Sequence, residues 1–65
     1  MTDLEKLKHL LKHWSEHNET HIQTYIEWAG KAEALGKEEV SKLLKKIAEE
    51  TKRIDELLVK ALGSL

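Results

Sequence analysis

The sequence predicts an all-α protein, an antiparallel helical hairpin that dimerises into a four-helix bundle. Apolar residues recur every three to four positions in two long segments, which is the period of an α-helix. The chain of 65 residues contains no proline, the residue that interrupts helix interiors. Gly36 separates the two segments, and glycine readily takes the left-handed conformation that ends a helix.

The first helix is predicted over residues 3–35, followed by a turn at 36–37. Thr2 and Glu5 have the spacing of a capping box, in which the Thr2 hydroxyl accepts a hydrogen bond from the Glu5 amide. Asn18 and His21 interrupt an apolar stripe that we expect to face the second helix. That stripe consists of Leu4, Leu7, Leu11, Trp14, Tyr25, Trp28, Ala32 and Leu35.

The second helix is predicted over residues 38–62, which makes residues 1–65 a single domain. Glu38 and Glu39 lie in its first turn, where negative charge complements the helix dipole. Thr51 is the polar position of its stripe, which otherwise consists of Val40, Leu44, Ile47, Ile54, Leu58 and Ala61.

Both apolar stripes are wider than a single helix–helix contact requires. A stripe that approaches half of the helix surface packs against two neighbours, and two-fold dimers are the commonest oligomers. We therefore expect a homodimer with an interface that includes Leu10, Trp14, Ile22, Tyr25, Ile26, Trp28, Leu43 and Leu57.

Composition argues against several classes of function. With 11 basic and 12 acidic residues the net charge is −1, so no basic surface is predicted for nucleic acid or an anionic membrane. The absence of cysteine excludes disulfides and thiolate metal sites. No apolar run approaches the ~20 residues of a membrane span, and the charged N-terminus does not resemble a signal peptide. We expect a cytoplasmic protein.

Nothing in the sequence indicates catalysis. The segment from His17 to His21 resembles the zinc-protease helix in its histidine spacing, but that motif needs glutamate directly after the first histidine. Asn18 occupies that position. No glycine-rich loop is available to bind phosphate, so we expect a protein that is not an enzyme.

Four histidines fall at intervals of four residues: His9, His13, His17 and His21. Residues four apart lie above one another on a helix face, where a pair of imidazoles can chelate a metal. Each step turns about 40° around the helix, so His21 is predicted in the apolar stripe, His17 beside it, and His9 exposed to solvent.

Three interpretations of these residues stay open. In the first, Asn18, His21 and Thr51 form a buried polar layer that only specifies packing. In the second, His17 and His21 bind a divalent transition metal such as nickel or zinc, with His13 as an additional ligand. Carboxylates from Glu50 or Asp55, or the same residues of a partner chain, would complete that site. In the third, the histidines make the interface respond to pH.

The run from His13 to His21 resembles a family of short helical domains with the signature H-W-x-x-H-N-x-x-H, and the similarity extends over residues 4–62. Members occur alone or fused to small nickel-binding maturation proteins of carbon monoxide dehydrogenase. The resemblance implies metal handling, with matching positions at His13, Trp14, His17, Asn18 and His21. We therefore expect either a metal-binding homodimeric module or a structural dimerisation or docking module.

Overall fold

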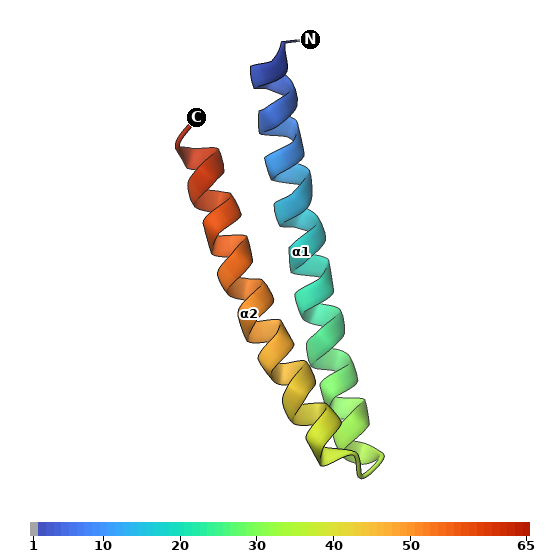
Figure 1. Ribbon diagram of the computed structural model, residues 1–65. Coiled ribbons are helices and arrows are strands. Elements are labelled where there is room, and N and C mark those ends of the chain that lie inside the picture. The colour runs from blue at the N-terminus through green and yellow to red at the C-terminus, as the bar shows by residue number, and fades with distance from the viewer. Residues whose placement is uncertain (1) are drawn as a thin grey trace.

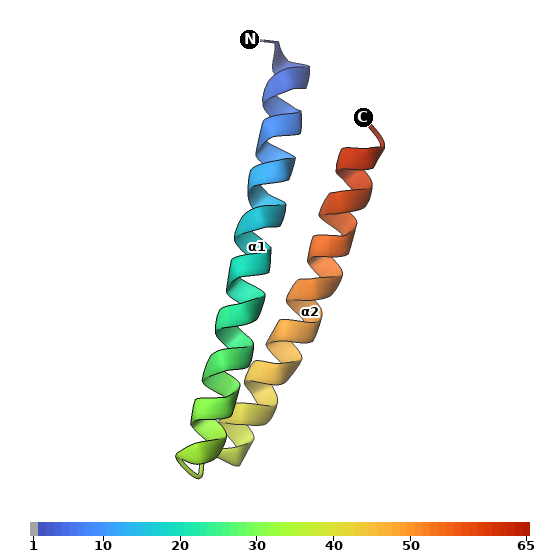
Figure 2. The same cartoon turned by 180° about the vertical axis from the view of Figure 1, so that it is seen from behind.

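A computed structural model describes residues 2–65 and contains two helices, α1 (Asp3–Ala34) and α2 (Glu38–Gly63). The helices run antiparallel and side by side, as Figure 1 shows from the front and Figure 2 from behind. The described residues contain no strand. The predicted all-α hairpin is confirmed, and each helix ends within one residue of its predicted limit.

Local chemistry sets the start of α1 and the turn that follows it. The Glu5 amide donates to Thr2 Oγ1 at 3.2 Å, as the capping pattern predicts. Gly36 has a φ of 77°, and the amides of Gly36 and Lys37 donate to the carbonyls of Glu33 and Ala32 at 3.0 and 2.9 Å. This pair of bonds is the Schellman motif, which satisfies carbonyls at a helix end.

The contact between the helices differs from the predicted one. On α1 it alternates steps of four and three residues through Leu11, Ser15, Asn18, Ile22, Tyr25, Ala29 and Ala32, which are all buried or half-buried. On α2 the matching set is Ser41, Leu44, Ala48, Thr51, Asp55, Leu58 and Leu62. This spacing is the heptad pattern of helices that pack at a shallow angle. We call this contact the seam.

The observed seam differs from the predicted contact by a rotation of roughly 50° about each helix axis. Trp14, Trp28 and Ile47 were predicted between the helices, but their exposed fractions are 45%, 52% and 43%. Small residues take their places because they let the backbones approach closely. Figures 1 and 2 show the helices closest near the turn, where Ala29 and Ala32 are 1% and 7% exposed.

The hairpin is long, thin and without a large core. Its principal extents are 51 × 17 × 11 Å. The radius of gyration is 15.2 Å, compared with about 11 Å for a compact domain of this length. Among the described residues no large side chain is fully buried. One layer of two helices therefore leaves much of its apolar surface in contact with solvent.

Candidate interaction face and histidine stripe

One surface of the hairpin carries most of its exposed large apolar side chains. Along α1 and its C-cap residue these side chains repeat every seven residues, with a histidine in the middle: Leu7, Trp14, His21, Trp28 and Leu35. On α2 a second set repeats in the same way: Val40, Ile47, Ile54 and Ala61. Because seven residues are nearly two helical turns, each set forms a continuous stripe.

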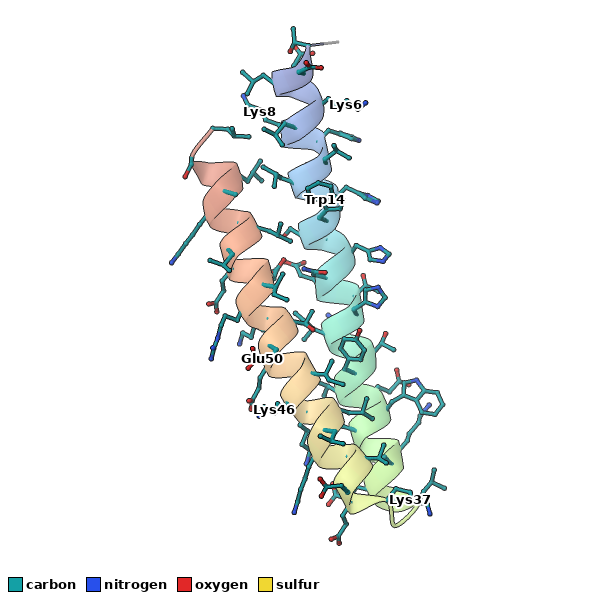
Figure 3. All side chains as sticks on the ribbon, in the orientation of Figure 1. Lys6, Lys8, Trp14, Lys37, Lys46 and Glu50 are labelled. Carbon is teal, nitrogen blue, oxygen red and sulfur yellow. The ribbon has the colours of Figure 1, made fainter. Side chains whose placement is uncertain are left out.

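Both stripes flank the same side of the seam. We call the surface that they form together the aromatic face. Figure 3 shows Trp14 over the near side of α1. The exposed fractions of Ile47 and Ile54 are 43% and 53%, so α2 contributes apolar surface beside the two tryptophans of α1.

The opposite side of the seam carries charged side chains beside its apolar ones. It forms a shallow groove lined by the apolar residues Ile22, Ile26 and Ala48 and by the charged residues Lys45, Glu49 and Lys52. Lys45 Nζ also lies 3.8 Å from Glu33 Oε2, a contact that links the two helices on this side. Charged side chains thus limit the apolar area of the groove.

The polar part of the seam is not the predicted layer. Asn18 and Thr51 are half-buried there as expected, but His21 is exposed because the seam is rotated away from it. The Thr51 hydroxyl donates to the Ile47 carbonyl of its own helix at 2.7 Å. The polar contact across the seam is instead the bond from Ser15 Oγ to Asp55 Oδ1, also 2.7 Å long.

The sequence contains a signal for this contact that the interpretation of the large apolar residues missed. Ser15 and Asp55 belong to the heptad positions that also contain Ile22, Ala29 and Ala48. Small and short polar residues at every seventh position favour close helix packing. This signal is weaker than a stripe of tryptophan and isoleucine, so the larger side chains dominated the prediction.

Three of the four histidines, His13, His17 and His21, form a column of neighbouring rings on the exposed surface of α1. The ring centroids of His13 and His17 are 6.1 Å apart, and those of His17 and His21 only 4.4 Å. Tyr25 continues the column, with its ring 6.0 Å from His21 and inclined by 19°. His17 and His21 therefore have the proximity that an i,i+4 chelating pair requires.

The carboxylates proposed as additional ligands lie elsewhere in the single chain. Asp55 accepts its hydrogen bond from Ser15 within the seam. Glu50 lies with Lys46 along the edge of α2 that is turned away from α1 (Figure 3). Across residues 2–65, no group of three or more histidine, aspartate and glutamate side chains could hold a metal.

The predicted interface residues are divided between the two sides of the hairpin. Trp14 and Trp28 lie on the aromatic face, and Tyr25 is half-buried beside it. Half-buried Leu10 and the exposed Leu43 and Leu57 flank this face. Ile22 and Ile26 lie on the other side, in the charged groove. The dimer interface itself stays a prediction.

The chain is thus a two-helix hairpin with an exposed apolar face. It belongs to the family described as "Domain of unknown function (DUF8180)", which matches residues 7–65. It is 42% identical over 58 residues to a protein of Archaeoglobus fulgidus named "Uncharacterized protein", covering 89% of this chain and 92% of that protein. No solved structure matches the chain.

These comparisons name neither a metal nor a maturation protein of carbon monoxide dehydrogenase, so that resemblance stays a prediction. Within the described part of the chain, neither helix is long and apolar enough to cross a membrane.

Proposed function

We propose that the chain is a homodimerisation module in which two hairpins pair through their aromatic faces and form a four-helix bundle. The observation that supports this function is the exposure of large side chains on one face. Trp14, Trp28 and Ile54 are 45%, 52% and 53% exposed, whereas the seam buries mainly small residues. Contiguous apolar patches of this kind on soluble proteins mark interaction sites.

The accessible surface supports pairing on the scale of a stable dimer. The hairpin has 5310 Å² of accessible surface, about 1,100 Å² more than the ~4,200 Å² expected for a compact monomer of its mass. A stable protein–protein interface buries about 800 Å² on each partner. Burial of the aromatic face by a second hairpin would remove an accessible area of about the size of this excess.

A second copy also fits the shape and charge of the hairpin. The smallest extent of 11 Å corresponds to one layer of helices, and stacking two such layers gives a four-helix bundle. With a net charge of −1, two copies repel each other only weakly. Lys31 Nζ lies 4.2 Å from the centroid of the Trp28 ring and 3.3 Å from Glu27 Oε1. The face therefore has a charged rim, as protein interfaces do.

Sedimentation equilibrium of the purified chain at micromolar concentration tests this function. We expect about twice the 7.5 kDa chain mass. Ile54→Glu places a charge on the aromatic face and should give a folded monomer, because a buried unpaired carboxylate opposes association.

The matched control is Ile26→Glu, on the groove side. Ile26 is 58% exposed and Ile54 53% exposed, so the two changes perturb a single hairpin to a similar degree. Ile26→Glu should leave the dimer intact. A monomeric unmodified protein, or a dimer that only Ile26→Glu disrupts, would contradict pairing through the aromatic face.

Metal binding is a second candidate function, supported by the 4.4 Å separation of the His17 and His21 rings. Nickel and zinc are the metals to test, since both accept imidazole ligands. If the pair chelates, either ion should raise the melting temperature of protein without a histidine tag. The His17→Ala/His21→Ala double variant should abolish the rise.

A further inference from the structure

The α1 stripe of the aromatic face is symmetric about His21. Trp14 and Trp28 lie seven residues before and after it, and Leu7 and Leu35 lie fourteen residues before and after it. A two-fold axis perpendicular to the helix at His21 therefore superimposes tryptophan on tryptophan and leucine on leucine. Such an axis relates two antiparallel α1 helices.

The α2 stripe has the same symmetry at nearly the same level of the hairpin. Ile47 and Ile54 form its inner pair, with a midpoint between Glu50 and Thr51. Counting along both helices from the bond between Ser15 and Asp55 places His21 level with Glu49. The two centres differ by less than two residues, or about 2 Å of helix rise. One axis can therefore relate both stripes of two chains.

Two hairpins can pair about a two-fold axis that is either perpendicular or parallel to the helices. The position of His21 distinguishes these two arrangements. An axis parallel to the helices would set α1 against the partner's α2 and place His21 among Ile47 and Ile54 of the partner subunit. Burying an imidazole there without a polar partner costs free energy. The perpendicular axis instead sets His21 beside His21 of the partner subunit, and like polar positions at one level specify helix register.

From this placement we infer that the dimer holds a divalent transition metal ion near its two-fold axis, coordinated by His17 and His21 of both subunits. The inference rests on the homodimer proposed above. Each chain supplies a pair of imidazoles with centroids 4.4 Å apart, and the residues described in one chain contain no third ligand for them. The partner's pair completes the set.

The ligand type limits the metal. Four neutral imidazoles without thiolate or carboxylate suit zinc, nickel, copper or cobalt and disfavour magnesium and calcium, which prefer oxygen ligands. The Tyr25 ring stacks beside His21 and restricts the orientations of that imidazole. His13 lies further along the column, with its centroid 6.1 Å from His17, and is not needed to complete four ligands.

Calorimetric titration of metal-free, untagged protein with zinc chloride, and separately with nickel chloride, tests the site. We expect one ion bound for every two chains. Since only the dimer contains the complete site, saturating metal should tighten dimerisation by about ten-fold or more. His17→Ala/His21→Ala should abolish this binding.

The matched control is His9→Ala/His13→Ala, which removes the same number of imidazoles at the same spacing from the same helix. It should retain one ion per two chains. One ion per chain, no binding, or equal loss in the two double variants would overturn the shared site.

Sedimentation in EDTA separates the two proposals. A dimer in EDTA that takes up no metal overturns the shared site and leaves the dimerisation module standing. If the protein is a monomer in EDTA, the proposal that it dimerises without metal is overturned. If that monomer then pairs around one ion per two chains, the shared site is supported.

Discussion

Two buried serines at the seam differ in whether their hydroxyl groups form a hydrogen bond. Ser15 is 9% exposed and donates to Asp55. Ser41 is 2% exposed, and its hydroxyl has no hydrogen-bond partner among the described residues. A buried polar group without a partner lowers stability, whereas a paired one contributes to it. The same substitution should therefore have opposite effects at the two positions.

We expect Ser41→Ala to raise the free energy of unfolding by about 1 kcal/mol, since it removes an unpaired hydroxyl and favours helix. Ser15→Ala should lower it by about 1 kcal/mol, because Asp55 loses its donor within the seam. Urea unfolding followed by circular dichroism, at one protein concentration, measures both. Changes of the same sign would contradict the bonding of the two serines.

At the scale of the helices, the features predicted correctly depend on local chemistry. The Thr2 cap and the Gly36 turn each involve residues within five positions of one another, so the sequence alone contains the necessary information. The rotation of the seam about each helix axis, in contrast, does not depend on residues that are close together in the sequence. Leu11 and Asn18 belong to both the predicted and the observed contact, which share every seventh residue.

The two alternatives differ in the neighbouring positions, where Trp14 competes with Ser15 and Trp28 with Ala29. Both stripes have helical period, so periodicity cannot choose between them. The choice depends on how closely the backbones approach, which is a property of the two helices together. The prediction of His21 between the helices was wrong because of this one error in rotation.

Substitutions at two exposed glycines, Gly30 and Gly36, test the helix geometry. A Cβ added at Gly30 would meet nothing within 4 Å, so Gly30→Ala should stabilise the protein by about 1 kcal/mol through helix propensity. Gly36 has a φ of 77°, and Gly36→Ala should cost about 1 kcal/mol or more in that left-handed conformation. Thermal unfolding of the two variants measures this difference. A loss of stability at Gly30 would show that α1 is not continuous there.

At the scale of the whole molecule, the proposed dimer would supply the large core that the described hairpin lacks. The fully buried residues of its seam are mostly small, and its two tryptophans are outside that seam. Trp14 and Trp28 give the free surface its area, and His21 lies between them at the centre of symmetry. An interface that repeats about a two-fold axis must bring the residue at that axis against its own copy.

This requirement gives a direct test of the perpendicular axis. The chain contains no cysteine, so His21→Cys introduces a single thiol at the expected centre. Under oxidised glutathione, two copies of this variant should form a disulfide in high yield, because Cα atoms near the axis approach within the roughly 4.4–6.8 Å that a disulfide spans.

His9→Cys is the control, an exposed position on the same helix, twelve residues away and about 120° further around it. In an antiparallel pair centred on His21, the two introduced thiols would lie about 36 Å apart and should remain unlinked within the dimer. Non-reducing electrophoresis measures the linked fraction of each variant. If His9→Cys cross-links as readily as His21→Cys, the two α1 helices do not cross the axis at His21, and the four imidazoles do not meet.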